Sequence, residues 1–389
     1  MRQIYFDNSA TTPICDEALE RYIEVAKGHF GNPSSLHSLG VDAEHIIEGA
    51  RRDILASLYT GVGDVVFTGS GSEANNLAIL GRAYAKNRFR LGAKIITTMG
   101  EHASVDMPYQ ALERDGFTVV RIPTRDGEVD LAALEDALSG NVILVSVMLV
   151  NNETGAVYNI PEVAERVKKF APEAYLHVDA TQGYMKIPFS PEVLGADTVT
   201  VSSHKIEGPK GVGALYISPR VIKERGITAQ VLGGGQEKGL RSGTENVPAI
   251  AAFGVAARVA QTNIEANAEK MSSLRDRLIA SIENSPELSE IKITKPRYAA
   301  PHILNITLPG IRSETMLHYL SSEGIYVSSG SACSSNTGHK SAALLAFGKS
   351  EGEADSSMRI SFSRNNTEEE VDALVDALRS GVARLARKR

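Results

Sequence analysis

Lys205 is the residue whose position first points to chemistry. It lies in the stretch SSHKIEGPKGVGALYIS, directly after His204. The alternation of Val199 and Val201 predicts one face of a strand before it, and Gly208-Pro209 predicts the turn after it. A lysine at a strand end is commonly a solvated charge. A partly buried lysine can instead form a Schiff base with a carbonyl cofactor, and other polar clusters must decide between these two interpretations.

The segment TGSGSEANN, residues 68–76, predicts a strand end, a loop of small residues and the start of a helix. Gly71 and Ser72 would place unpaired backbone amides and a hydroxyl at the helix N-terminus, where anions bind favourably. Ordinary helix capping by a serine with Glu73 nearby explains the same pattern. Taken alone, the segment therefore leaves both an anion site and simple capping open.

Asp179 closes another apolar strand, in the motif HVDATQ. An isolated buried carboxylate is costly, so this side chain needs a partner. A cationic ring nitrogen of a ligand or an arginine of the chain would serve equally well. Gln182, three residues later, could reach the same ligand.

Two further polar motifs follow strands, and each is ambiguous alone. His102 in GEHASV begins a loop, and Asn151 and Asn152 in NNETG follow a very apolar run. Together with the anion site, the strand-end acid and Lys205, they match the needs of pyridoxal phosphate. The phosphate would sit on the helix, the acid would face the pyridinium nitrogen, and the lysine would form the Schiff base. His204 could hold a phosphate oxygen.

Cys333 lies in SSGSACSSNTGHKS, residues 328–341, whose composition is too small and polar for a core segment. Buried structural cysteines favour apolar neighbours, so a loop thiol is the better interpretation. A thiol that can approach a cofactor-bound substrate suggests nucleophilic sulfur chemistry. Cys15, in TTPICDEAL, has no such context.

The elements that must position these residues follow from the apolar pattern. From about residue 65 to 217, helical segments alternate with the runs DVVFTG, AKIITT, FTVVRIP, NVILVSVML, AYLHVDA, DTVTVSS and GVGALYIS. This alternation predicts an α/β fold with a mostly parallel seven-stranded sheet and helices on both faces. Ligands in such sheets bind beyond the carboxyl ends of the strands. A long helical segment from about Val247 to Asn284 and a later α+β pattern predict a smaller second domain.

Composition and charge exclude several classes of protein. The chain has 389 residues, 42% apolar and 23% charged, with a net charge of −6 and a pI near 5.9. No basic cluster is long enough to follow nucleic-acid phosphates, and no apolar run reaches the roughly 18 residues of a membrane span. The start MRQIYFDNSATTP lacks the apolar core of a signal peptide. Two cysteines make no disulfide framework, so we expect a reducing, cytoplasmic setting.

The whole set of motifs resembles the cysteine desulfurases of the NifS and IscS type, a branch of the class-V aminotransferases. The motifs, in the family's order, are YFDNSATTP, GNPSSLH, TGSGSEANN, GEHASV, NNETG, HVDATQ, SSHKIEGPKGVGAL, GGGQEKGLRSGTEN, SSGSACSS and SSMRISFSRNNTEEE. The resemblance implies a fold-type I pyridoxal-phosphate homodimer that converts L-cysteine to L-alanine and leaves a persulfide on the enzyme. It also implies a large domain over 15–258 and a small domain over 1–14 and 259–389. No metal site is expected.

The resemblance also assigns roles to individual residues. Lys205 would hold the internal aldimine, His102 would stack on the ring and move protons, and Cys333 would accept the sulfur. The cofactor-binding residues implied are Gly71, Ser72, His102, Asn152, Asp179, Gln182, Ser202, His204, Lys205 and Thr244 of the partner subunit. Arg359, with Asn152 nearby, would take the substrate carboxylate. For Thr244 and Arg359, only the resemblance assigns the role.

The sequence departs from the family pattern at two places and leaves rivals open. Ser72 replaces the usual threonine but keeps the hydroxyl, and ISFSR after Arg359 lacks the common glycine. The context of Cys333 favours the long, mobile loop of this branch, which implies sulfur transfer to a scaffold or carrier protein. An aminotransferase of the same fold would not need Cys333, and a cofactor-binding regulatory subunit would show no turnover. The sulfur could serve iron–sulfur clusters, thiolated RNA or another cofactor.

Overall fold

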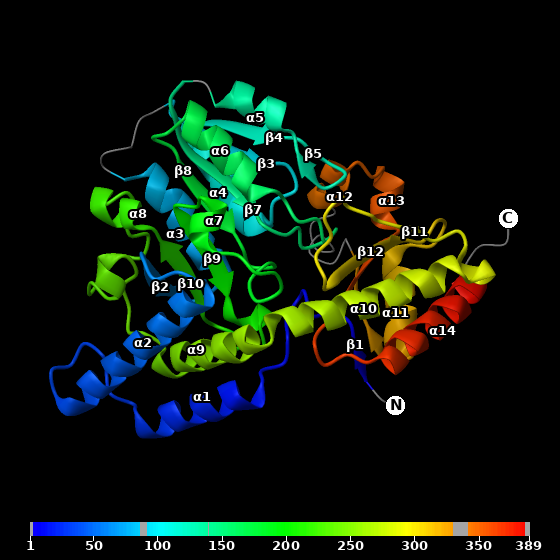
Figure 1. The fold of residues 1–389 in the computed structure, drawn as a ribbon, viewed down its shortest axis with the longest axis horizontal. Helices are drawn as coiled ribbons and strands as arrows, with labels where there is room; N and C mark the ends of the chain where they lie inside the picture. The colour runs from blue at the N-terminus through cyan, green and yellow to red at the C-terminus, as the bar shows by residue number, and fades with distance from the viewer. Residues whose placement is uncertain (1–2, 86–91, 139, 330–340, 386–389) are drawn as a thin grey trace.

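The computed structural model describes residues 3–85, 92–138, 140–329 and 341–385. A seven-stranded sheet forms the larger part of the molecule (Figure 1). Its strands, in spatial order, are β2 (Asp64–Thr68), β10 (Gly213–Ile217), β9 (Thr198–Ser202), β8 (Tyr175–Asp179), β7 (Val142–Met148), β3 (Lys94–Thr98) and β4 (Thr118–Ile122). β10 runs antiparallel to both neighbours, and the other pairs are parallel. The predicted mostly parallel seven-stranded sheet is therefore confirmed.

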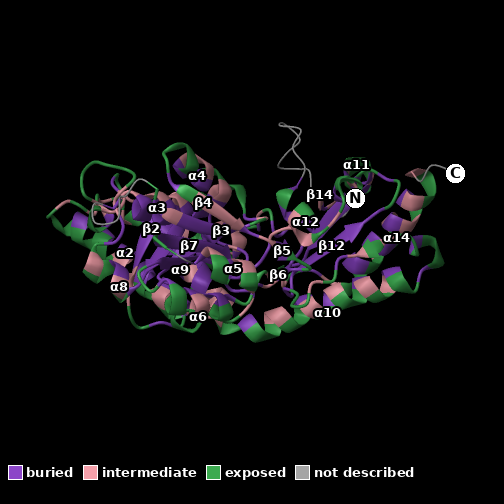
Figure 2. Ribbon diagram, turned by 90° about the horizontal axis from the view of Figure 1, so that it is seen from above, coloured by how far each residue is buried: buried purple, intermediate pink, exposed green. Residues whose placement is uncertain are grey.

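Helices cover both faces of this sheet, which explains why its strands are nearly continuous apolar runs. The core on one face includes α1 (Asp16–Gly28), α2 (Ser38–Ser57), α5 (Leu131–Ala137), α6 (Ile160–Phe170), α7 (Pro191–Leu194) and α9 (Val247–Thr262). The core on the other face includes α3 (Gly71–Ala83), α4 (Ala103–Arg114) and α8 (Pro219–Glu224). Neighbouring strand residues alternate between the two cores, as Val65 and Val66 do. Figure 2 shows the buried strands between the helices.

A second, antiparallel sheet of four strands carries a core of its own. Its order is β11 (Lys292–Ile293), β12 (Ile303–Thr307), β15 (Ser357–Ser361) and β14 (Ser328–Ser329). The helices α10 (Ile264–Glu283), α11 (Ser313–Ser322) and α14 (Glu368–Leu385) contribute to this core. Figure 1 shows α10 and α14 side by side at the end of the molecule remote from α1 and α2.

The helical segment predicted over 247–284 is two helices instead of one. Asn263 separates α9 from α10 with φ −130° and ψ 27°, which lie outside the helical region. Asparagine favours such positions because its side chain competes for backbone hydrogen bonds. The break lets Phe253 of α9 pack in the first core and Met271 of α10 in the second.

The N-terminal segment connects the two sheets. β1 (Ile4–Tyr5) pairs in parallel with β13 (Ile325–Tyr326), beside the second sheet. A few residues later, the Thr12 amide donates to the His204 carbonyl over 2.9 Å, and the Cys15 amide donates to the Glu207 carbonyl over 2.8 Å. The segment therefore crosses from the second core to the edge of the first sheet.

The remaining elements are short. They are β5 (Thr124–Arg125), β6 (Glu128–Val129), α12 (Ala342–Phe347), α13 (Glu351–Asp355) and the 3₁₀ turns Ser203–Lys205, Glu237–Gly239 and Pro286–Leu288. Among the described residues, no helix combines the length and apolar character that crossing a membrane requires.

Candidate active site

A cavity of about 200 Å³ opens beyond the carboxyl ends of the strands of the large sheet. Its lining consists of Ser70, Gly71, Ser72, His102, Ser104, Met148, Val150, Asn152, Asp179, Thr181, Gln182, Ser202, His204 and Lys205. Nine of the residues expected from the sequence thus lie around one space: Gly71, Ser72, His102, Asn152, Asp179, Gln182, Ser202, His204 and Lys205. A ligand at this position agrees with the general rule for open α/β sheets.

One end of the cavity is formed by the start of α3. The Ser70 hydroxyl accepts from the Glu73 amide over 3.1 Å, so this serine is the N-cap. Gly71 and Ser72 follow in the first turn, where backbone amides have no partner within the helix. The capping interpretation is therefore confirmed, and the anion site stays a prediction that these amides would serve.

Two glycines keep this end open. A Cβ on Gly71 would lie 3.2 Å from Ser202 Cβ and 3.3 Å from Thr181 Oγ1, inside the space between α3 and the sheet. A Cβ on Gly213 would lie 2.6 Å from the nitrogen of Gly71. A side chain at Gly213 would therefore displace the backbone at the start of α3, and one at Gly71 would crowd the space between α3 and the sheet.

Asp179 lies at the end of β8 with 5% of its surface exposed. Its Oδ2 accepts from Asn75 Nδ2 over 2.8 Å, and its Oδ1 accepts from the Thr181 amide over 2.9 Å. These two bonds fix the carboxylate at the floor of the cavity. They satisfy part of its hydrogen-bonding capacity, but no described cation forms an ion pair with it.

His102 is the N-cap of helix α4, whereas the sequence predicted that it begins a loop. Its Nδ1 lies 2.8 Å from Ser104 Oγ and accepts from the Ser104 amide over 3.1 Å. The ring is open to the cavity, yet the surrounding protein removes bulk water. This desolvation lowers the pKa of His102; Lys205 and Arg359 act in the same direction, and Asp179 opposes them.

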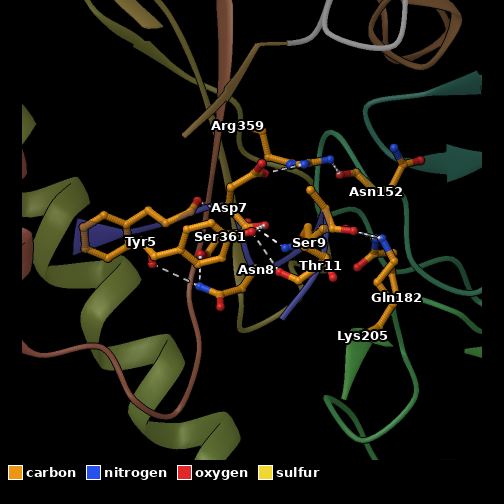
Figure 3. Close-up of polar contacts among 12 residues, drawn as sticks. Tyr5, Asp7, Asn8, Ser9, Thr11, Asn152, Gln182, Lys205, Arg359 and Ser361 are labelled. Carbon is orange, nitrogen blue, oxygen red and sulfur yellow. Dashed lines mark hydrogen bonds and ion pairs between the residues drawn. The ribbon is translucent and has the colours of Figure 1, made fainter. Parts of the chain in front are cut away.

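Lys205 does not end the strand, as the sequence suggested. β9 stops at Ser202, and Lys205 closes a 3₁₀ turn over Ser203–Lys205. Its Nζ donates to the Ser9 carbonyl over 2.5 Å and to the Ala10 carbonyl over 2.8 Å. The N-terminal segment therefore holds the Lys205 amine through two carbonyls, and Figure 3 shows Lys205 among the residues of this region.

Three other polar side chains complete the walls. His204 Nδ1 lies 3.2 Å from Thr11 Oγ1, and burial lowers the pKa of His204 to about 4, with Lys205 and Lys210 adding to the effect. Gln182 Nε2 donates to the Ser9 carbonyl over 2.9 Å. Asn152 also lines the cavity. His204, Gln182 and Asn152 are thus uncharged near neutral pH.

Arg359, on β15 of the second sheet, reaches the same region with 8% exposure. Its Nη2 donates to Asp7 Oδ1 over 2.8 Å, and its Nη1 donates to the Asn152 carbonyl over 2.9 Å. Nε is buried without a hydrogen-bond partner among the described residues. Figure 3 shows the guanidinium between Asp7 and Asn152.

Three expected residues are not among those that line the cavity. Arg359 lies beside it, hydrogen-bonded to the carbonyl of Asn152. Thr244 is exposed and does not line it. Cys333 lies outside the described residues. Their expected roles therefore stay predictions.

Several residues that form hydrogen bonds to the predicted site residues were not predicted from the sequence. Asp7, Ser9 and Ala10 belong to a motif, YFDNSATTP, that was recognised only as a family feature. Asn75 lies in TGSGSEANN, one helical turn after Gly71. Ser104 lies in GEHASV, two residues after His102. Their proximity in the sequence was the available signal, but their bonding partners lie on other elements.

These residues fit pyridoxal phosphate. The start of α3 suits a phosphate, Asp179 suits a ring nitrogen that carries a proton, and Lys205 supplies an amine in the same cavity. Arg359 Nε and Ser9 Oγ, next to this cavity, are buried polar atoms without partners among the described residues. The cavity joins an anion site, an acid and an amine in one space, as that cofactor requires.

Comparisons with known proteins agree with this chemistry. The aminotransferase class-V family matches residues 4–374. Cysteine desulfurase IscS 1 of Archaeoglobus fulgidus is 40% identical over 385 residues, covering 98% of this chain and 97% of that protein. A solved NIFS-like protein is 35% identical with a TM-score of 0.90, covering 99% of this chain and 100% of its own. SspA in complex with cysteine is 30% identical with a TM-score of 0.80, covering 94% and 100%.

Proposed function

Because the chain belongs to the aminotransferase class-V family, we propose that it is a pyridoxal-phosphate-dependent cysteine desulfurase, which converts L-cysteine to L-alanine. The observation that carries this proposal is the cavity in which Lys205, Asp179 and the start of α3 meet. Relatives named cysteine desulfurase and a related structure that contains cysteine support the choice of reaction and substrate. The fold-type I architecture is that of these relatives.

Each end of the cofactor has a matching part of the cavity. Bound pyridoxal phosphate supplies an electron sink for bonds next to the substrate amine. The amides and hydroxyls of Gly71, Ser72 and Ser202, with His204, would bind its phosphate. Asp179 would face the ring nitrogen, and Gln182 and Asn152 would contact the oxygen side of the ring. Lys205 would bond to the aldehyde carbon.

Arg359 is placed to orient the substrate. Its guanidinium is nearly buried and fixed on two sides, by Asp7 and by the Asn152 carbonyl. A planar guanidinium fixed in this way can bind a carboxylate through two parallel hydrogen bonds. The amine of L-cysteine would then lie toward Lys205, which with His102 is the protein's means of handling protons in the cavity.

Cys333 is the proposed sulfur acceptor. Its thiolate would take the sulfur atom of L-cysteine, the carbon–sulfur bond would break, and the carbon would gain a proton as L-alanine forms. The persulfide on Cys333 would pass its outer sulfur to a scaffold or carrier protein, for example one that assembles iron–sulfur clusters. The family resemblance and the thiol's small, polar sequence context support this role.

A homodimer is the proposed functional unit. Large apolar side chains stand exposed on the surface, among them Phe30 at 74%, Leu36 at 99% and Leu232 at 84%. Leu232 precedes the exposed Thr244 by 12 positions in the sequence. A second copy covering these side chains would bring Thr244 of the partner subunit toward a phosphate site, and the burial of apolar surface would stabilise the contact.

The domain limits and the cellular compartment are also proposals. Ile4 and Phe6 pack in the core of the second sheet, which supports assigning 1–14 together with 259–389 to a small domain beside the large domain 15–258. The cytoplasm is proposed because the sequence holds only two cysteines, which cannot form a disulfide framework.

The direct test is turnover of L-cysteine by the purified, cofactor-loaded protein. We expect equal amounts of L-alanine and reducible sulfur, and a yellow protein whose cofactor borohydride fixes to Lys205. Lys205→Ala should lose both turnover and the fixed cofactor. Amino-group exchange between amino and keto acids without sulfur release would show an aminotransferase instead. Cofactor binding without any turnover would show a regulatory subunit, and a borohydride-fixed cofactor in Lys205→Ala would disprove the role of that lysine.

A further inference from the structure

A continuous chain of hydrogen bonds runs behind the cavity from β8 to His102. His177 Nε2 lies 3.1 Å from Asn75 Oδ1, and Asn75 Nδ2 lies 2.8 Å from Asp179 Oδ2. The same Nδ2 lies 2.9 Å from Ser104 Oγ, and Ser104 Oγ lies 2.8 Å from His102 Nδ1. This series of hydrogen bonds joins Asp179 and His102, both proposed to contact the cofactor. The residues that link them are Asn75 and Ser104, which have no assigned role.

The chemistry of each group fixes the direction of the bonds. A carboxylate oxygen can only accept, so the amide nitrogen of Asn75, not its oxygen, must face Asp179. The amide oxygen then faces His177, which donates from Nε2. Burial lowers the pKa of His177 to about 4 against the opposing effect of Asp179, so this ring is neutral near pH 7. The second hydrogen of the Asn75 amide is left for Ser104 Oγ.

The Ser104 backbone amide donates to His102 Nδ1 over 3.1 Å, so this nitrogen is an acceptor. The Ser104 hydroxyl oxygen accepts from Asn75 and lies 2.8 Å from the same Nδ1. Because Nδ1 is an acceptor, the hydroxyl donates its one hydrogen to it. Two donors thus converge on Nδ1, which can accept them only without a proton of its own. In the neutral ring, the proton must then be on Nε2.

We propose that Asn75 and Ser104 are positioning residues that hold His102 in its neutral form with the proton on Nε2. What this tautomer means for the reaction rests on the proposed function. His102 then enters the reaction as a hydrogen-bond donor to atoms in the cavity, and Nε2 cannot accept a proton from the substrate. A Lys205 amine that carries no charge, in the same cavity, can accept one instead.

The charged groups that face His102 do not reverse this arrangement. Asp179 favours the imidazolium form, whereas Lys205 and Arg359 disfavour it. Ser104 opposes protonation directly, because a proton on Nδ1 would face a backbone N–H and would require the hydroxyl to turn. The bonds to Nδ1 therefore select the tautomer and also resist its protonation.

The test is the imidazole nitrogen spectrum of full-length protein labelled with ¹⁵N-histidine, recorded before and after pyridoxal phosphate is added. His102→Gln identifies the His102 signals. We expect the wild type to show the Nε2–H tautomer at neutral pH. An Nδ1–H tautomer in the wild type would overturn the proposal without any further variant.

Variants then test the series of hydrogen bonds through Asn75 and Ser104. Ser104→Ala should raise the midpoint of the His102 titration by about half a pH unit, as expected from losing one donor, and Asn75→Ala should give a mixture of tautomers. Ser104→Thr, which keeps the hydroxyl, and Asn76→Ala, which removes a neighbouring amide outside the chain, should match the wild type. If Ser104→Ala and Asn75→Ala both match the wild type as well, the proposal is wrong. Because the spectrum needs no turnover, absence of desulfurase activity would refute the proposed function separately.

Discussion

Arg359 and Asp7 form an ion pair, in which Nη2 of the arginine lies 2.8 Å from Oδ1 of the aspartate. The two residues come from opposite ends of the chain, and the pair joins the second sheet to the N-terminal segment that also holds Lys205. Both charges are mostly buried, with side-chain exposures of 10% and 21%. The pair therefore has a fixed geometry, unlike most surface ion pairs.

Asp7→Ala should weaken the binding of L-cysteine. The guanidinium would lose one of its two fixed contacts, and Arg359 could no longer present its plane to a carboxylate. A hydrogen bond to a charged group is worth about 1.5–3 kcal/mol, so we expect KM to rise about tenfold or more. The change in kcat should be smaller. Steady-state kinetics with L-cysteine measure both.

Two variants control this measurement. Asp7→Asn keeps an oxygen acceptor for Arg359 and should raise KM less than Asp7→Ala. Asp276→Ala removes an exposed partner of Arg275 and should leave the kinetics unchanged. A loss in kcat with unchanged KM in Asp7→Ala would show that Asp7 acts on the chemical step and not through the substrate carboxylate.

Much of the site could be predicted because its residues follow strands. In a parallel sheet, the ends of neighbouring strands meet at one edge, so Asp179, His102 and the start of α3 converge even though they are far apart in the sequence. Small residues such as Gly71 suggested a phosphate site, but only in combination with the other motifs, because the segment alone fits simple helix capping equally well. The exact place of Lys205 was less predictable, because the 3₁₀ turn after β9 depends on contacts with the N-terminal segment.

The rest depends on contacts between distant parts of the chain. Asp7 is separated from Arg359 by 352 positions, and Asn75 from Asp179 by 104. No local pattern distinguishes such side chains from ordinary turn or helix residues. The break between α9 and α10 was missed for a related reason. The segment has apolar helical character on both sides of Asn263, and only the two separate cores show why it must divide.

The buried His177 predicts a loss of stability in acid. Its pKa of about 4 in the folded protein is below the usual value of about 6.5 for an unfolded chain. Between these values the unfolded chain binds more protons, so the free energy of unfolding falls as the pH drops. At pH 5, one such histidine costs roughly 2 kcal/mol relative to pH 7.

Urea unfolding of wild type and His177→Gln at pH 7 and pH 5 measures this contribution. The variant should lose less stability between the two pH values, because it has no proton to gain at this site. His45→Gln, which replaces an exposed histidine of α2, should show the same loss as the wild type. Equal losses in His177→Gln and the wild type would mean that His177 is not held neutral.

Sharing of sites between subunits can be tested by mixing inactive chains. A Lys205→Ala subunit paired with a Thr244→Ala subunit creates one site that contains both intact groups. After random exchange, we expect about a quarter of the wild-type activity at limiting pyridoxal phosphate. Replacing the Lys205→Ala chain by the double variant, Lys205→Ala with Thr244→Ala, should restore nothing. Equal activity in the two mixtures, with exchange shown by tagged chains, would argue against a shared site.

Cys333→Ser should abolish persulfide formation while leaving cofactor binding intact. A hydroxyl at neutral pH is a far poorer nucleophile toward sulfur than a thiolate. Exchanging one small polar side chain for another at a surface position usually changes stability by about half a kcal/mol. Cys15→Ser is the matched control, because burial raises the pKa of the Cys15 thiol and so disfavours its thiolate. Alanine and sulfide production by both variants is the measurement. Normal turnover by Cys333→Ser together with an inactive Cys15→Ser would show that Cys15, and not Cys333, accepts the sulfur. Normal turnover by both variants would exclude the persulfide mechanism.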